Sequence, residues 1–312
     1  MIGEFLLPAL NIAVQEIAWR TLPGGWRPPN RSEMEKRVIQ DRLGRRSRFR
    51  RMPSGKRLFL TDRDVAILQS LHRYRFLRTT QLVALLQPKS EKRFIERLGD
   101  LYHEAGLIDR PAAQWHRFDA RYQPIVYELS SKGMSLLENS SELPLRAVTF
   151  SVGGRRSPVP QFEHAMMIVD TLVTVELEAR DTSSQRFVPV DEILTRMPTR
   201  SLDRSAPKHP LAVPTTIRPN LHIPSLTKPM MTHLIPDALY GIEHLIDGEK
   251  RYRFYALECE YKSPRRRSTA RLSSTALKRS AYDTFIAERG YREAWGIPNL
   301  DIRIIDRAAG NR

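Results

Sequence analysis

Cysteine is nearly absent from this chain of 312 residues. The single Cys259 excludes an internal disulfide framework and any zinc site built from several cysteines, which is typical of proteins from a reducing compartment. The eight histidines show no HExxH spacing, so a zinc site of that type is not expected. No GxxxxGK[ST] or GxGxxG motif follows an expected strand, which argues against an ATPase or a dinucleotide enzyme.

Long hydrophobic runs are also missing. The most apolar stretch, residues 1–19, is interrupted by Glu4, Pro8 and Glu16 and has no basic segment before it, unlike a signal peptide or a spanning helix. No other window approaches the roughly 20 apolar residues that a membrane helix requires. We therefore expect a cytoplasmic protein that has no membrane partner.

Acidic residues are too few to balance the basic ones. The chain has 51 Lys and Arg against 35 Asp and Glu, a formal net charge of +16. Such an excess of positive charge indicates the partner rather than the fold, and nucleic acid is the leading candidate. The length predicts two domains, at roughly 100–200 residues each.

The positive charge is concentrated near the N-terminus. Residues 27–57 contain twelve Lys or Arg and three acids, together with several Pro and Gly. After an N-terminal arm over residues 1–26, we therefore expect a flexible basic arm over residues 27–57, of the kind that lies along phosphates or in a minor groove. A merely solvated run of charge is the alternative.

Residues 58–142 have the pattern of a winged helix-turn-helix domain. Thr61 is a typical N-cap for a first helix, whose apolar positions continue to Phe76, and Thr79 opens a second helix. Ser90 caps a third helix, which ends at Gly106 and has an apolar stripe that includes Phe94 and Leu98. Two strands, 107–110 and 125–129, then flank a polar tip, and a helix closes the domain. In this fold the third helix enters the major groove of DNA while the wing touches the backbone.

The basic arm, the third helix and the hairpin tip supply the expected contacts with double-stranded DNA. The predicted DNA-binding residues are Arg45, Arg46, Arg48, Arg50 and Arg51 of the arm, Lys92, Arg93 and Arg97 of the helix, and Arg117 and Arg121 of the tip. A winged helix used only for protein contacts is the alternative.

A linker rich in Pro, Ser, Gly and Arg, residues 143–160, separates this part from a domain over residues 161–312. We expect a helix over 162–179, a strand over 186–194, mostly loop over 197–231, strands over 234–242 and 252–262, a helix over 270–288 and a strand over 300–305. The Asp247-Gly248 pair between the strands 234–242 and 252–262 predicts that they form a hairpin. That order is typical of a restriction-endonuclease-like α/β core. The predicted fold class is therefore α+β or α/β, with a winged helix-turn-helix followed by a nuclease-like domain.

Charged residues with a chemical role are concentrated in the two central strands of this domain. Asp237 precedes Glu260 and Lys262 in a spacing that resembles the PD-(D/E)xK signature of metal-dependent nucleases. Because side chains alternate along a strand, Glu258, Glu260 and Lys262 are expected on one face, and Cys259 on the other. We therefore expect Asp237, Glu258 and Glu260 as Mg²⁺ ligands and Lys262 beside the reacting phosphate.

The runs TDRDVAILQSLHRYRFLRTTQLVALL, RLGDLYHEAGLIDR and VYELSSKGMSLL resemble the winged-helix half of the bacterial and plasmid replication-relaxation proteins. The later PDAL, LECEY and LKRSAY runs are similar to the PD and xExD hairpin and the Lys/Tyr helix of that family. The resemblance implies that Glu258 and Glu260 hold the acidic positions, and that Lys278 and Tyr282 lie on the helix that follows.

Two functions remain open at this point. The first is a regulator that marks a DNA site on a plasmid, phage or integrated element and controls replication, transfer or transcription there. The second is a Mg²⁺-dependent DNA endonuclease or nickase that uses Asp237, Glu258, Glu260 and Lys262, so whether the chain is an enzyme is left undecided. Alternatively, the C-terminal domain serves oligomerisation or docking, with a second copy of the chain or other DNA-processing proteins as partners.

Overall fold

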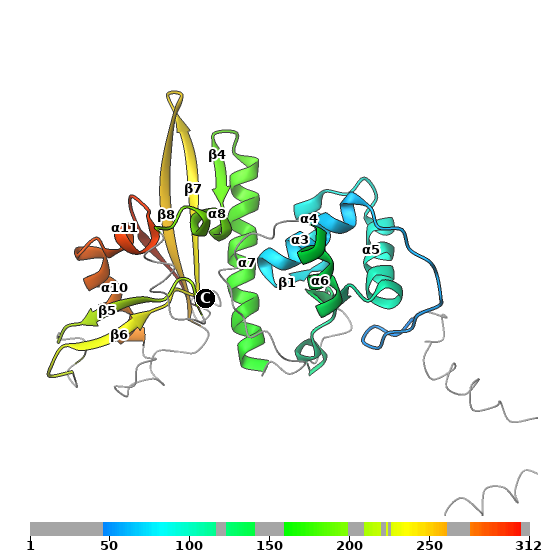
Figure 1. Ribbon diagram of the computed structural model, residues 1–312, viewed down its shortest axis with the longest axis horizontal. Coiled ribbons are helices and arrows are strands. Elements are labelled where there is room, and N and C mark those ends of the chain that lie inside the picture. Colours follow the sequence, from blue (N-terminus) through cyan, green and yellow to red (C-terminus); the bar gives the residue numbers. More distant parts are fainter. Residues whose placement is uncertain are drawn as a thin grey trace, which may run out of the picture. The chain divides into compact units, whose positions relative to one another are not determined.

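The computed structural model describes residues 46–116, 123–140, 159–198, 209–219, 223, 226–260 and 275–306 (Figure 1). By its contacts the chain divides into residues 1–52 and 53–312. The described part mixes helices with small sheets, so the fold class is α+β. Among the described helices, none combines the length and the apolar character needed to cross a bilayer.

The three expected helices of the N-terminal half are present as α3 (Asp62–Tyr74), α4 (Thr79–Leu86) and α5 (Glu91–Asp100). Thr61 and Asp64 form a capping box at the start of α3. Ser90 accepts a hydrogen bond from the backbone N–H of Arg93 at the start of α5. A π-helical turn, η1 (Leu101–Ala105), continues α5 and ends at Gly106 in the left-handed conformation. These N-caps and this C-cap were predicted from the sequence, because capping is a local interaction.

A small antiparallel sheet follows these helices, with the strand order β1-β3-β2. It consists of β1 (Phe76–Arg78), β2 (Ile108–Asp109) and β3 (Val126–Leu129), and η2 (Ala112–His116) and α6 (Ser131–Ser140) complete this half. We expected Phe76 to lie on the first helix, but the chain leaves that helix at Arg75, whose φ is 66°. The buried side chains of Phe76 and Leu77 then pack as a strand.

The C-terminal half is built on a four-stranded mixed sheet with the order β4-β7-β8-β9. Its strands are β4 (Gln185–Val188), β7 (Ala238–Ile246), β8 (Glu249–Glu260) and β9 (Asp301–Asp306), of which only β8 and β9 run parallel. Asp247 and Gly248, both at positive φ, form the two-residue turn between β7 and β8. The hairpin predicted from this Asp-Gly pair is therefore confirmed.

Helices cover both faces of this sheet (Figure 1). The long helix α7 (Val159–Asp181) packs against Tyr240, Leu257 and Cys259 on one face. The helices α8 (Val190–Thr195), α10 (Thr275–Ala287) and α11 (Gly290–Trp295) pack against Leu239, Phe254 and Ala256 on the other face. A second ribbon, β5 (Val213–Ile217) with β6 (Met230–Leu234), joins this second layer.

Two strand predictions in this half were wrong in detail. The strand expected over 186–194 ends at Val188, because Pro189 interrupts it and caps α8. Most of the described residues of 197–231 lie outside strands, as expected, but β5 and the start of β6 also lie in this range. The strand expected over 234–242 is divided into β6 and β7, and the connection contains Pro236, which lacks the N–H that a continuous ladder needs.

Helix α7 belongs to the cores of both halves. Its Val169 and Val173 pack with α3, α4 and α5, whereas Ile168 and Val175 pack against the sheet. Polar contacts follow the same seam. The Tyr74 hydroxyl donates to Glu176, Arg78 pairs with Asp170, and Arg180 donates to the Leu85 carbonyl at 2.7 Å. The two halves therefore share one helix, which begins where the predicted linker over 143–160 ends.

Candidate functional site

A pair of acidic side chains converges at the centre of the C-terminal half. Asp237 lies just before β7, and Glu258 lies near the end of β8 on the face that packs against α10. The backbone N–H of Asp237 donates to the Leu257 carbonyl at 3.1 Å, which joins the two strands at this level. The side chains of Asp237 and Glu258 are 19% and 11% exposed. Such buried carboxylates require partners.

Helix α10 supplies two of these partners from positions one turn apart. The Lys278 ammonium contacts both acids, pairing with Glu258 and lying 3.4 Å from Asp237 Oδ1. The Tyr282 hydroxyl is buried and donates to Glu258 Oε1 at 2.5 Å. Residues four apart on a helix share a face, so both side chains point into the same space.

Helix α7 supplies a histidine from the opposite side. His164 Nε2 lies 3.1 Å from Asp237 Oδ2 and 2.9 Å from the Cys259 carbonyl. Because a carbonyl oxygen only accepts, Nε2 carries a proton and donates. The backbone N–H of Cys259 also donates to Asp237 Oδ2, at 2.8 Å. We call Asp237, Glu258, His164, Lys278 and Tyr282 the carboxylate site.

The two acids of the carboxylate site differ in protonation. Burial raises the pKa of Glu258 to about 7, against the opposing effect of Lys278. Burial also acts to raise the pKa of Asp237, but the hydrogen bond from His164 and the charge of Lys278 outweigh it, so the net shift is downward. The same hydrogen bond raises the pKa of His164. Two carboxyls with separated pKa values are a frequent feature of functional sites.

The arrangement fits a cation between the two acids. Asp237 and Glu258 each present an oxygen to one point, and the Lys278 ammonium holds that point. Within the described ranges, His, Cys, Asp and Glu side chains do not gather in groups of three or more that could hold a metal. Among the described residues, Asp237 and Glu258 are the carboxylates that a divalent ion at this point would meet, and such an ion would displace the ammonium.

The other predicted site residues of β8 are placed differently. Glu260 lies on the same side of the strand as Glu258, but it pairs with Arg279 at 3.2 Å rather than with Asp237. Cys259 is buried against α7 on the opposite face, and burial raises its pKa to about 12, so its thiol is not a nucleophile at neutral pH. Lys262 lies outside the described residues.

Helix α5 has one buried and one exposed face. Phe94 and Leu98 are buried, whereas Lys92, Arg93 and Ile95 are exposed. Arg97, predicted with Lys92 and Arg93 as a DNA contact, forms a two-pronged pair with Asp64, at 2.6 and 2.9 Å. Its guanidinium also donates to the Phe59 carbonyl at 2.6 Å. The described contacts of Arg97 are therefore internal to the fold.

The segment before α3 is attached along α5 and η1. The backbone N–H and the hydroxyl of Ser54 each donate to the Glu104 carboxylate at 2.8 Å. Lys56 pairs with Asp100 at 2.6 Å. The remaining predicted DNA contacts are Arg46, Arg48, Arg50 and Arg51 in the described residues 46–52, and Arg45, Arg117 and Arg121, which lie outside the described residues.

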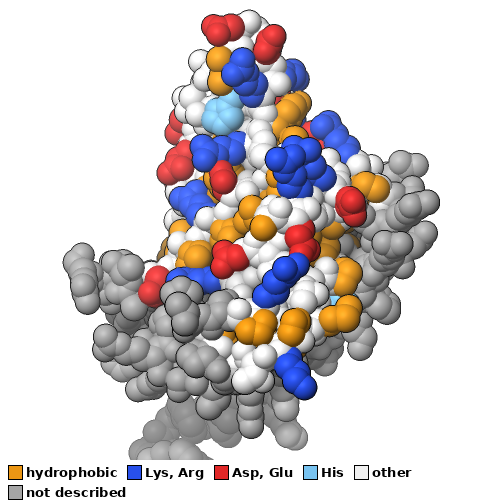
Figure 2. Space-filling view, turned by 90° about the vertical axis from the view of Figure 1, so that its left-hand side faces the viewer, with side chains coloured by type: hydrophobic (Ala, Val, Ile, Leu, Met, Phe, Trp, Pro, Cys, Tyr) orange, Lys and Arg blue, Asp and Glu red, His pale blue; other side chains and the backbone are white. Residues whose placement is uncertain are grey.

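Charges of both signs cover the surface of the C-terminal half that Figure 2 shows, where Lys and Arg are interspersed with Asp and Glu. Around the β7–β8 hairpin this mixture reflects ion pairs. Arg253 pairs with Asp301 at 2.6 Å, and Lys250 pairs with Glu243 at 3.0 Å. This surface therefore lacks the single sign of charge that is typical of a DNA-binding face.

Sequence reasoning found Asp237 and Glu258 but gave no role to His164. Asp237 and His164 are 73 residues apart, and no short spacing links them. The useful indication in the sequence was the spacing of Lys278 and Tyr282. These residues are four positions apart, about one helical turn, so their side chains lie on one face of a helix.

Comparison with known proteins gives one family. The family described as Replication-relaxation matches residues 68–297, about three quarters of the chain, from within α3 to just past α11. This match includes α5 and every residue of the carboxylate site. No curated protein matches the chain, and no solved structure matches it either.

Proposed function

Because this chain belongs to the replication-relaxation family, which is associated with the replication or transfer of plasmids and other mobile elements, we propose that it acts there by binding double-stranded DNA. In this proposal it recognises a site on a plasmid, phage or integrated element and controls replication, transfer or transcription at that site. The N-terminal half is the DNA-binding part and has a winged helix-turn-helix arrangement.

The observation that carries this proposal is the exposed face of α5. Helices α3 and α4, the sheet β1-β3-β2 and α7 bury one side of α5 and leave Lys92 and Arg93 in solvent. A third helix held in this way is the element that winged helices place in the major groove. Its exposed face also carries Glu91 and Glu96, so the sequence-independent affinity is assigned to the basic residues 27–57.

A gel-shift titration of the full chain on duplex DNA at several salt concentrations tests this proposal. We expect binding that weakens steeply with salt, and a loss of affinity in the double variant Lys92→Ala, Arg93→Ala. The matched control is Lys228→Ala with Arg292→Ala, which removes the same charges from exposed positions in the C-terminal half. Equal affinity of the two double variants would contradict a DNA-facing α5, and absence of binding by the wild type would contradict the proposal itself.

A second candidate function is favoured by the carboxylate site: Mg²⁺-dependent cleavage or nicking of DNA. The supporting observation is the convergence of Asp237 and Glu258 on one cation position, with the Lys278 ammonium beside both. In this function Asp237 and Glu258 hold the metal, Lys278 binds the phosphate, and Tyr282 orients Glu258. Glu260 and Lys262, which we expected in the site, are not needed for this arrangement.

Mg²⁺ bound there would lower the pKa of a water ligand and screen the charge on the phosphate. The chain's own contribution is positional, because His164 and the Cys259 N–H fix the Asp237 carboxylate through two contacts. Supercoiled plasmid incubated with and without Mg²⁺ or Mn²⁺ tests the activity. Metal-dependent nicking that is lost in Asp237→Asn, a variant of nearly equal volume, would support it. DNA binding without nicking in the wild type would contradict it.

A further inference from the structure

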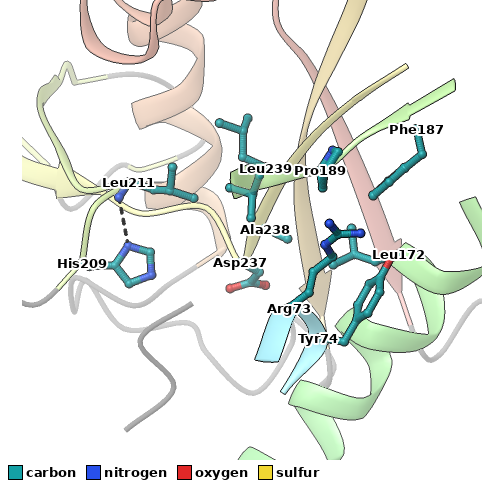
Figure 3. A pocket seen from close by; sticks show the side chains of 11 residues that line it. Arg73, Tyr74, Leu172, Phe187, Pro189, His209, Leu211, Asp237, Ala238 and Leu239 are labelled. Atoms are coloured by element: carbon teal, nitrogen blue, oxygen red, sulfur yellow. Dashed lines mark hydrogen bonds between the residues drawn. The ribbon is translucent and has the colours of Figure 1, made fainter. Parts of the chain in front are cut away.

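A small pocket lies beside the carboxylate site and shares Asp237 with it. Figure 3 shows its lining, in which Asp237 lies between His209 and Arg73 in this view. Apolar side chains complete the wall, chiefly Leu172 of α7 and Leu239 of β7. The pocket therefore brings α3 of the N-terminal half against the acid that begins β7.

Arg73 is the cation of this pocket. It lies on the last turn of α3, and 40% of its side chain is exposed. Its described acidic neighbour, Asp191, is 3.5 Å away, at the outer limit of a hydrogen bond. The other oxygen of that carboxylate, Asp191 Oδ1, is buried without a hydrogen-bond partner. The guanidinium is thus held loosely and keeps donors for another acceptor.

His209 adds a neutral donor across the pocket. Its Nδ1 accepts a hydrogen bond from the backbone N–H of Leu211 at 3.3 Å, as the dashed line in Figure 3 marks. An Nδ1 that accepts is unprotonated, so the ring proton is on Nε2. Burial lowers the pKa of His209, and the nearby Lys278 lowers it further. The imidazole therefore stays neutral at pH 7 and offers one N–H to a ligand.

The size and charge of the pocket define the ligand. Its cavity of about 30 Å³ holds roughly two water-sized groups, which is too little for a nucleobase. Two small acceptor atoms that meet an arginine and a neutral N–H donor are what a phosphodiester presents. His164 and Lys278 pair with the Asp237 carboxylate and offset its negative charge toward an anion in the pocket.

We propose that this pocket binds a backbone phosphate of DNA, with Arg73 and His209 donating to its two non-bridging oxygens. This inference rests on the proposed DNA-binding function and adds a second contact point, in which α3 and the C-terminal sheet hold the same strand. Arg73 then positions DNA at the carboxylate site, so the N-terminal half does more than recognise a distant sequence.

The test is duplex-DNA binding by the full-length protein over a salt series, for Arg73→Ala and the matched control Arg292→Ala. Both lose one exposed arginine, and the ion pair that Arg73 loses, with Asp191, is long at 3.5 Å. We expect Arg73→Ala to bind several-fold more weakly and to lower the slope of log affinity against log salt by about 0.9, the value for one phosphate contact. Arg292→Ala is expected to behave as the wild type.

Further variants separate the possible outcomes. Arg73→Lys keeps the charge and should recover part of the slope, and His209→Ala should weaken binding with little change of slope because the neutral ring releases no counterion. Addition of inorganic phosphate, against chloride at equal ionic strength, shows whether free phosphate competes for the pocket. Equal binding by Arg73→Ala and Arg292→Ala would overturn this inference and leave the DNA-binding function intact. No binding by the wild type would overturn both.

Discussion

Arg97 is expected to stabilise the fold rather than to contact DNA, and the substitution Arg97→Ala tests this. The Asp64 carboxylate with which it pairs is 1% exposed, and Arg97 itself is 24% exposed. Removing one partner of a buried pair costs about 3–5 kcal/mol, because the other charge remains buried. Thr61 still donates to Asp64 from its N–H at 2.8 Å and its hydroxyl at 2.9 Å, so we expect a cost near the lower limit, ~3 kcal/mol.

Urea unfolding followed by far-UV circular dichroism measures this cost. For a unit of this size ~3 kcal/mol corresponds to a decrease of roughly 6–12 °C in Tm. The control is Arg93→Ala, one turn earlier on α5, which removes the same charge from an exposed position and should change the stability by less than about 0.5 kcal/mol. Asp64→Asn combined with Arg97→Ala should show strong coupling, since the two side chains act on each other.

The pair also predicts a pH dependence. Burial acts to raise the pKa of Asp64, but the hydrogen bonds from Arg97 and Thr61 outweigh it and hold the pKa below 3.8. A carboxyl whose pKa is lower in the folded state stabilises the fold above its unfolded pKa, and the stabilisation is lost as pH falls through the folded value. Arg97→Ala brings the folded-state pKa of Asp64 closer to the unfolded value, so this variant should lose less stability than the wild type as pH falls below the unfolded pKa of aspartate. The reasoning is refuted if Arg97→Ala unfolds like Arg93→Ala while DNA binding is lost.

Three other predictions concern the sheet and the closing helix. Burial raises the pKa of Glu258 to about 7, so the folded state binds a proton more tightly than the unfolded state, and stability should fall as pH rises from about 4.5 to 7. Urea midpoints of Glu258→Gln should lack this decline, and an equal decline in both proteins would contradict the assignment. Tyr282→Phe removes the 2.5 Å hydrogen bond to Glu258 and should cost about 1.5–3 kcal/mol of stability in the same assay. In Gly133→Ala the new Cβ would lie 2.2 Å from the Leu107 carbonyl oxygen, so we expect the free energy of unfolding to fall by about 3 kcal/mol. A wild-type Tm in this variant would contradict the prediction and show that α6 can move away from β2.

Local interactions explain what the sequence predicted correctly. The caps at Thr61, Ser90 and Gly106 and the Asp247-Gly248 turn depend only on neighbouring residues. Alternation along β8 likewise separated Glu258 from Cys259, because side chains in a strand point to opposite faces. Helical periodicity placed Phe94 and Leu98 in the core, because apolar residues four positions apart lie on one face of a helix.

Only the tertiary structure decided which side chains meet. The sequence by itself determined the family resemblance, a fold that mixes helices and sheets, the concentration of basic residues over 27–57 and the acids at 237 and 258. It did not bring His164 to Asp237 or place Arg73 in one pocket with the same acid, because those arrangements depend on how α7 and α3 pack against the sheet. It also assigned Arg97 to DNA, since an arginine on a helix surface is not distinguishable by periodicity from one that pairs with a buried carboxylate 33 residues earlier. Partners of this kind are selected by the burial of charge, and burial exists only once the chain has folded.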